Sequence, residues 1–246
     1  MTINLKTLII ACVLMAASMT ALAGLEDGKA AFTKKNYALA LKELTPLAKS
    51  GDAEAETYLG FMHANGQGVA QDYKEAMKWY KLAAKQGNAA AQFTMGSMYT
   101  EGQGGEQDHK QAVRWYLLAA GHGDAFAQFN LGLSYANGQG IARDYKEAVK
   151  WFRRAASQGD ADAQNSLGVM YANGHGVTAS EAVAYALYNL SATIDQSSEN
   201  MATSNRAALI AELPPRILDA AQTLTREMAK PGNMLKALDA YLKNPH

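Results

Sequence analysis

The sequence DAEAETYLGFMHANGQGVAQDYKEAMKWYKLAAKQG occupies residues 52–87, and two similar blocks follow it without a gap. They read NAAAQFTMGSMYTEGQGGEQDHKQAVRWYLLAAGHG at 88–123 and DAFAQFNLGLSYANGQGIARDYKEAVKWFRRAASQG at 124–159. A repeat of about 20 to 50 residues is typical of a solenoid, because one unit is too small to bury its own apolar face. The three blocks therefore predict a fold built by stacking, with one structural unit per block.

Each block carries the signals of two helices. In the first block, Asp52 predicts the start of one helix, and Asn65-Gly66 predicts its end, since glycine readily adopts a positive φ. Asp72 predicts the start of a second helix, and Glu75 three residues later completes an Asp version of the capping box. The equivalent helix starts in the other two blocks are Asn88, Asp108, Asp124 and Asp144.

A tryptophan recurs at one place in the second helix of each block, as Trp79, Trp115 and Trp151. Close helix crossings place large side chains beside small ones. We therefore expect these tryptophans to be buried against small residues such as Gly60. Each block then forms two antiparallel helices.

The blocks share the pattern A-x-A-x-x-x-L-G-x-x-Y-x-x-G-x-G-V-x-x-D-x-x-x-A-x-x-W-x-x-A-A-x-x-G, which resembles the SEL-one-like repeat (SLR), a relative of the tetratricopeptide repeat. The resemblance is close over 52–159 and extends to about 25–192 when the more divergent outer repeats are included. It implies an all-α fold, a right-handed superhelical solenoid of antiparallel helix pairs that binds proteins. Departures from the pattern are His63, His109 and Gly105.

The N-terminal residues 1–23 have the pattern of a signal peptide. Lys6 precedes an apolar run, and Ala21-Leu22-Ala23 resembles a signal-peptidase site, which predicts cleavage after Ala23. Two alternatives stay open, namely retention as an anchor and lipidation at Cys12, the only cysteine. Residues 24–51 match the second half of a repeat and are expected to form an N-terminal capping half-repeat.

The C-terminal third is predicted to close the solenoid. Residues 160–195 read as a degenerate repeat that has lost two residues, so that Thr178 and Glu181 form its capping box and Tyr185 takes the tryptophan place. Residues 196–246 are expected to form C-terminal capping helices and a tail. The helices are expected at 197–212 and 216–230, and the apolar face of the second contains Leu218, Ala221, Leu224 and Met228.

The composition gives no sign of a nucleic-acid or anionic-membrane partner, because 23 Lys and Arg balance 23 Asp and Glu. The G-Q-G loops lack the preceding strand and the following Lys-Ser/Thr of a phosphate loop. The five histidines are not spaced as metal ligands on a helix. The sequence therefore predicts no catalytic residues, no metal and no cofactor.

One stripe of the first helix in each block changes from block to block, whereas Ala55, Leu59 and their equivalents recur. A position held by packing recurs, while an outward position is free to vary, and aromatic residues are frequent in binding hot spots. In this type of repeat the first helices line the concave surface. We therefore predict a partner-binding groove containing Tyr58, Phe61, Phe93, Phe126, Phe129, Asn130 and Leu133. The alternative is that some of these side chains pack between neighbouring helices.

The repeat, the export signal and the variable stripe together favour a non-enzymatic scaffold or regulator that binds a protein or peptide in the bacterial cell envelope, in the periplasm or secreted. The resemblance implies partners such as sensor kinases in signal transduction or cell-wall enzymes. Two other functions are kept open. One is a hydrolase acting on cell-wall or β-lactam compounds, and the other is a secreted effector that binds host proteins.

Overall fold

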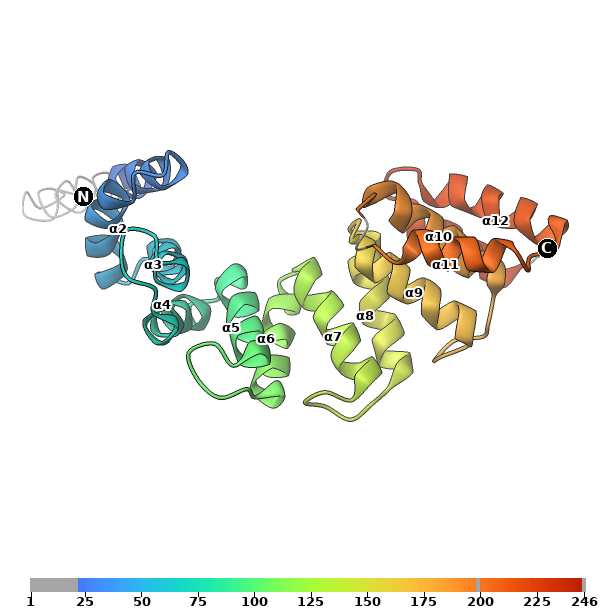
Figure 1. Cartoon of the computed structure of the whole chain (residues 1–246), viewed down its shortest axis with the longest axis horizontal. Coiled ribbons are helices and arrows are strands. Elements are labelled where there is room, and N and C mark those ends of the chain that lie inside the picture. The colour runs from blue at the N-terminus through green and yellow to red at the C-terminus, as the bar shows by residue number, and fades with distance from the viewer. Residues whose placement is uncertain (1–21, 198–199, 245–246) are drawn as a thin grey trace, which may run out of the picture. The chain divides into compact units, whose positions relative to one another are not determined.

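The computed structural model describes residues 22–197 and 200–244, and every regular element in these ranges is a helix. The chain divides into two compact units, Met1–Gln107 and Asp108–His246. Figure 1 shows the helices following one another in chain order within each unit. The predicted all-α solenoid of helix pairs is confirmed. Most of the expected signal peptide, residues 1–21, lies outside the described residues.

The N-terminal unit begins with a helix at 22–33. It continues with α2 (Tyr37–Lys49), α3 (Ala53–Asn65), α4 (Tyr73–Lys85) and α5 (Ala89–Glu101). Each of α3, α4 and α5 packs on the helix before it. One buried cluster joins the helix at 22–33, α2 and α3, and Leu44, Leu59 and Met62 are among its fully buried side chains.

The described part of the C-terminal unit contains the second helix of one repeat, then two complete helix pairs, and then three further helices. Its elements are α6 (His109–Gly121), α7 (Ala125–Asn137), α8 (Tyr145–Ser157), α9 (Ala161–Asn173), α10 (Glu181–Ile194), α11 (Ala202–Ile210), α12 (Pro215–Met228) and α13 (Met234–Lys243). We call α3, α5, α7 and α9 the first helices of their repeats, and α4, α6, α8 and α10 the second helices. A large buried cluster runs from α8 to α13.

The predicted helix boundaries are confirmed in the three regular repeats. The Asp52 side chain accepts a hydrogen bond from the N–H of Ala55 (2.8 Å), and α3 ends at Gly66 with φ of 64°. Asp72 caps α4 by accepting from the N–H groups of Lys74 and Glu75. These bonds lower the pKa of Asp72 below its ordinary value, because they stabilise its carboxylate.

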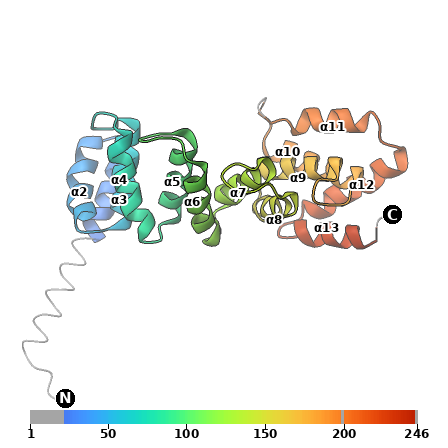
Figure 2. The same ribbon diagram turned by 90° about the horizontal axis from the view of Figure 1, so that it is seen from below.

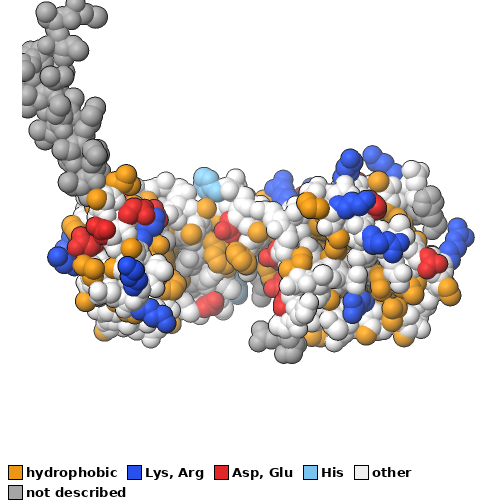
Figure 3. All heavy atoms as spheres, turned by 90° about the horizontal axis from the view of Figure 1, so that it is seen from above, with side chains coloured by type: hydrophobic (Ala, Val, Ile, Leu, Met, Phe, Trp, Pro, Cys, Tyr) orange, Lys and Arg blue, Asp and Glu red, His pale blue; other side chains and the backbone are white. Residues whose placement is uncertain are grey.

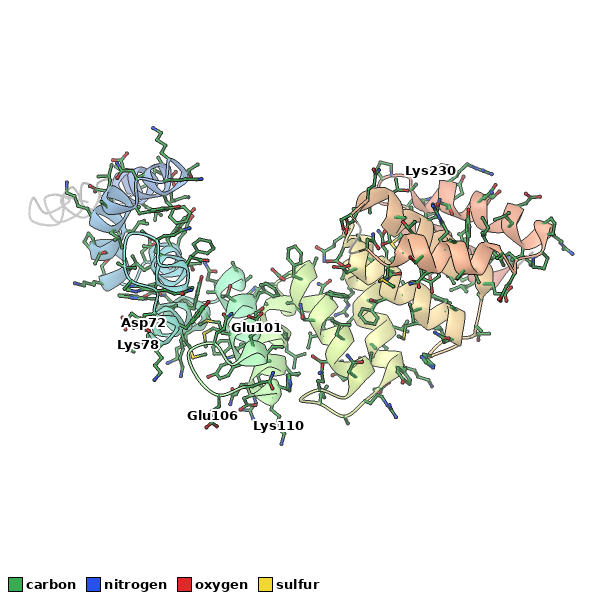
Figure 4. The ribbon with its side chains drawn as sticks, viewed as in Figure 1. Asp72, Lys78, Glu101, Glu106, Lys110 and Lys230 are labelled. Carbon is green, nitrogen blue, oxygen red and sulfur yellow. The ribbon has the colours of Figure 1, made fainter. Side chains whose placement is uncertain are left out.

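The capping box itself forms only in part. Its second half requires the Glu75 side chain to accept from the N–H of Asp72. That N–H instead donates to the carbonyl of His63 (2.9 Å), at the end of the preceding helix. Glu75 is then free to pair with Lys78 (2.6 Å). The Lys78 side chain points outward from α4, the helix that Asp72 caps (Figure 4). The N–H of Asp72 is therefore paired with the first helix of the repeat, and not with the Glu75 side chain of a capping box.

The prediction that the recurring tryptophans are the buried aromatics is wrong. Trp79, Trp115 and Trp151 are half-buried, whereas the residue that follows each of them is buried. Tyr80, Tyr116 and Phe152 are 3%, 3% and 1% exposed. In the first repeat a Cβ added to Gly60 would lie 2.9 Å from the Tyr80 ring, so the glycine makes room for the tyrosine. The adjacent positions lie about 100° apart on a helix, so the second faces the glycine, while Trp79 packs at the edge of the buried cluster.

The expected loss of two residues in the fourth repeat is also wrong. Ser180, not Thr178, caps α10, and its hydroxyl accepts from the N–H of Val183 (3.4 Å). Ser180 lies 36 residues after Asp144, so the period is unbroken. Tyr188 therefore takes the place of Phe152 and packs against Gly168. Thr178 and Glu181 also fit the spacing of a capping box, and this second match hid the register in the sequence.

The C-terminal helices cover the last repeat as expected, but their extents differ. Helix α12 packs on α10 through its buried face of Ala221, Leu224 and Met228, while Leu218 is half-buried. Helix α11 is shorter than predicted. The expected tail instead contains α13, whose Met234 and Leu238 are buried. Figure 2 shows α11 and α13 on opposite sides of the pair α9 and α10.

A buried amide links each repeat of the C-terminal unit to the preceding helix. The side chain of Gln128 donates to the carbonyl of Ala120 (3.4 Å), and that of Gln164 donates to the carbonyl of Ala156 (3.2 Å). In the N-terminal unit Gln92 does the same to Ala84 (3.0 Å). The equivalent residue of the first repeat is Glu56, which as a carboxylate has no proton to donate.

Glu56 is therefore expected to destabilise the protein near neutral pH. It is 3% exposed and accepts from Gln86 (2.8 Å). Burial raises its pKa above the ordinary value of 4.5, although the Gln86 bond opposes this shift. Between the ordinary and the raised pKa the folded protein binds more protons than the unfolded chain. Stability consequently falls as pH rises through this window, and the loss is complete above the folded pKa.

We expect Glu56→Gln to raise the free energy of unfolding by about 1 kcal/mol at pH 7. The glutamine can donate a hydrogen bond to the carbonyl that corresponds to that of Ala84, and the buried group is then uncharged. The measurement is urea denaturation of both proteins between pH 4 and 8. The gain should shrink toward acid pH, where Glu56 becomes protonated. A variant that is less stable than the wild type at pH 7 would show that the charge itself is stabilising.

Candidate functional site

The variable stripe places the predicted residues on three first helices. Tyr58 and Phe61 lie on α3, Phe93 lies on α5, and the other four lie on α7. The recurring residues of these helices, such as Leu59 and Leu131, are 2% and 0% exposed. None of the seven predicted side chains is fully buried. The chain divides into two compact units, and the residues are therefore described in two groups, one in each unit.

In the N-terminal unit, Tyr58 and Phe61 belong to an aromatic cluster centred on Phe32. The Phe32 ring lies 5.1 Å from Tyr58, 5.6 Å from Phe61 and 5.7 Å from Tyr37, always in an edge-to-face arrangement. Phe61 is 42% exposed, whereas the other three rings are half-buried. Such ring pairs contribute about 0.5 to 1.5 kcal/mol each. The cluster is therefore an ordered aromatic surface with one open ring.

Sequence reasoning missed Phe32 and Tyr37, because both lie in the segment interpreted only as a cap. Lys29, on the helix at 22–33, forms an ion pair that joins this helix to α3. The Lys29 ammonium lies 2.7 Å from Glu54 and 3.1 Å from Glu26. Hydrogen bonding to Glu54, and then to Glu26, raises the pKa of Lys29 above its ordinary value. Phe93, farther along the unit, is half-buried on α5.

In the C-terminal unit, α7 carries the most exposed of the predicted residues. Phe126 is 62% exposed, and its carbonyl accepts a hydrogen bond from the Asn130 side chain (2.8 Å). Phe129 is half-buried, with its ring 5.9 Å from that of Phe152. Leu133 is also half-buried and packs against the same core. Packing between helices thus accounts for the partial burial of Phe129 and Leu133. Phe126 is the solvent-exposed aromatic residue of this group.

The stripe becomes polar in the fourth repeat, and α11 contacts it there. Asn165 on α9 accepts a hydrogen bond from Asn205 on α11 (2.9 Å). Arg206 of α11 donates to the side chain of Asn189 on α10. Asn165 is the equivalent of Phe129, so an amide pair replaces an aromatic contact at this position. The open aromatic surface of this unit therefore lies on α7 and not on α9.

The second helices carry a different surface. The Tyr145 ring stacks on His175 (4.6 Å) and lies under the Arg143 guanidinium (5.5 Å), while Arg154 lies over Trp151 (4.5 Å). These contacts join neighbouring repeats or cover the half-buried tryptophan. On the face drawn in Figure 3, basic and acidic side chains lie among hydrophobic ones, as the neutral composition predicts.

Within residues 22–197 and 200–244, no group of three or more His, Cys, Asp or Glu side chains is placed to hold a metal ion. The helices of these ranges are too short or too polar to cross a bilayer. The G-Q-G loops, which could be mistaken for phosphate loops, approach the preceding repeat. A Cβ on Gly104 would lie 2.6 Å from the carbonyl oxygen of Tyr73, and these loops are therefore structural corners.

The repeats of this chain match those of a known family. A family model described as Sel1 repeat matches residues 16–42, 53–88, 89–124, 125–160 and 161–194, which is more than half of the chain. The chain belongs to the Sel1 repeat family. Sel1 repeat proteins are generally protein-interaction scaffolds and are typically not catalytic. A search of curated proteins gives no match.

Two solved structures extend the similarity to nearly the whole Sel1 repeat chain. One is a protective antigen present in uropathogenic Escherichia coli strains, which displays an SLR fold. It has a TM-score of 0.78 and 30% identity, and the match covers 92% of this chain and 49% of the antigen. This chain thus spans about half the length of the antigen. The other is a Sel1 repeat protein from Oxalobacter formigenes, with a TM-score of 0.70, 27% identity, and coverage of 89% and 99%.

Proposed function

We propose that this Sel1 repeat protein is a non-enzymatic scaffold or regulator of the bacterial cell envelope, and that its first helices bind a segment of a partner protein. The observation that carries the proposal is the exposure of aromatic rings at positions that vary between repeats, above all Phe126 at 62% and Phe61 at 42%. An ordered aromatic side chain loses little conformational entropy on binding and buries a large apolar area.

The first 23 residues support the envelope location. Their basic start, apolar run and Ala21-Leu22-Ala23 end form the pattern of a cleaved export signal. Among the residues that the structure describes, the first buried side chain is Leu25, which comes just after the proposed cleavage site. Cleavage after Ala23 would therefore leave the described buried core intact.

The test is a pair of double variants of the mature protein, residues 24–246, used to capture a partner from envelope extract. We expect Phe61→Asp with Phe126→Asp to weaken binding of the captured partner at least about tenfold, because hot-spot aromatics are buried on binding. The dissociation constant is measured by surface plasmon resonance with the purified partner. Circular dichroism checks that the helices remain.

The matched control is Leu82→Asp with Leu118→Asp. These leucines are 45% and 50% exposed and lie on second helices, so they match the aromatic pair in exposure but not in place. We expect this control to keep the partner. Equal loss in both variants, or loss only in the control, would place binding away from the first helices. Recovery of the protein from the cytosol with residues 1–23 intact would contradict the envelope location.

A further inference from the structure

A groove lies between the last two helices, away from the variable stripe. It has a volume of about 670 Å³ and is lined by one face of α12 and one face of α13. On α12 the lining residues run from Asp219 to Glu227, and along α13 they run from its N-cap Asn233 to its C-cap Asn244. At a rise of about 1.5 Å per residue, the groove follows these helices for roughly 12 to 16 Å. It is therefore long enough for two to three turns of another helix.

The floor of the groove is apolar and made mainly of small side chains. It contains Ala220 and Leu224 of α12 together with Ala237 and Ala240 of α13. Leu224 is buried beneath, whereas Ala240 is exposed at the mouth. Small residues at a helix surface allow another helix to approach closely. The alanines therefore allow another helix to come close to the floor, and Tyr241 of α13 also lines the groove.

The packing elsewhere in the same chain shows what covers such a helix pair. The pair α3 and α4 is followed by α5, which packs on α4, and the pair α7 and α8 is followed by α9, which packs on α8. In both cases the element that packs on the helix pair is another helix. Continuity of this stacking favours a helix as the occupant of the groove.

The walls of the groove carry opposite charges. Asp219 and Glu227 lie two turns apart along the α12 wall, and Lys236 lies on the α13 wall. Glu227 also pairs with Lys230 (2.6 Å), which lies outside the lining residues near the end of α12. A bound helix would meet carboxylates on one side and an ammonium on the other. Charges arranged in this way select the orientation of the helix.

We propose that the groove between α12 and α13 binds an amphipathic helix of a partner protein, with two basic residues about two turns apart facing α12 and a small apolar stripe on the floor. This surface is separate from the aromatic surface of the first helices. The helix α13 that forms its second wall is held by an ion pair of Asp239 with Arg153 on α8. The groove thus depends on contacts that α13 makes with the last repeats.

The probe is a synthetic, end-capped helical peptide of about 16 residues with an Ala and Leu stripe and two lysines two turns apart, beside the same peptide with glutamates in place of the lysines. Fluorescence anisotropy measures the binding of each peptide to the full chain. We expect the wild type to prefer the lysine peptide. The double variant Asp219→Lys with Glu227→Lys should reverse this preference. The dissociation constant of each peptide should change about tenfold.

Ala240→Trp should weaken binding of the lysine peptide at least about tenfold. The indole would fill the mouth of the groove, while the buried floor stays unchanged. Ala207→Trp on exposed α11 and Glu212→Lys, neither of which lines the groove, are the matched controls and should change nothing. Equal binding of both peptides, no binding of either, or full binding to Ala240→Trp would overturn the proposal. So would a wild-type dimer by light scattering that Ala240→Trp makes monomeric, since the occupant would then be a second copy.

Discussion

Replacement of Phe152 by alanine should lower the free energy of unfolding by about 3 to 5 kcal/mol, the range for a fully buried aromatic. The side chain is 1% exposed and lies where α8 crosses α7. Gly132 on α7 has no side chain there, and a Cβ added to it would overlap the Phe152 ring. The alanine variant leaves a cavity that neighbouring helices cannot fill without moving. Urea denaturation followed by circular dichroism measures the loss.

Trp151→Ala is the matched control, because it removes an even larger aromatic side chain one position earlier. Trp151 is half-buried, and its ring has the Arg154 guanidinium 4.5 Å above it. An exposed cation–π contact contributes about 0.5 to 1 kcal/mol, so the total loss should stay below about 2 kcal/mol. If Trp151→Ala proved the more costly change, the tryptophan would be the main packing residue of the repeat, and our assignment of the core would be wrong.

Gly104→Ala should lower the free energy of unfolding by about 2 to 4 kcal/mol, through two separate effects. Gly104 has φ of 81°, a conformation that disfavours any side chain. Its added Cβ would also lie 2.6 Å from the carbonyl oxygen of Tyr73 and 2.9 Å from the carbonyl carbon. Backbone atoms cannot turn aside as a flexible side chain can. The corner between this loop and the first turn of α4 would therefore have to open.

Gly51→Ala separates the two effects. Gly51 has φ of 93°, but nothing lies within 4 Å of an added Cβ. Its cost should be limited to the backbone conformation, about 1 kcal/mol. Thermal and urea unfolding of both variants give the comparison. Equal losses for Gly51→Ala and Gly104→Ala would show that the close approach to Tyr73 does not contribute to stability.

The helix boundaries were predictable because their causes are local. An Asp or Asn side chain reaches an N–H three residues ahead, and a glycine accepts the positive φ at the other end, whatever the rest of the fold does. Asp52, Gly66 and Asp72 are examples. The capping box was not predicted correctly from local sequence. The N–H of Asp72 donates to the carbonyl of His63, and this carbonyl becomes available only once the two helices lie side by side.

The candidate site was predictable only in part. Variation between repeats correctly pointed to side chains that are not buried, and Phe61 and Phe126 are exposed. It could not separate an open ring from a ring at the edge of the core, such as Phe129, because that depends on the distance to Phe152. Phe32 was missed because it reaches α3 from a helix outside the regular repeats.

The sequence by itself determined the number of residues per repeat, the two helices of each repeat and their caps, since these follow from period and from contacts within a few residues. Only the tertiary structure decided which of two adjacent aromatic residues fills the core, where the fourth repeat keeps its register, and that α13 forms a groove with α12. These features depend on contacts between segments far apart in the chain, such as Arg153 with Asp239, and a single sequence does not reveal such pairs.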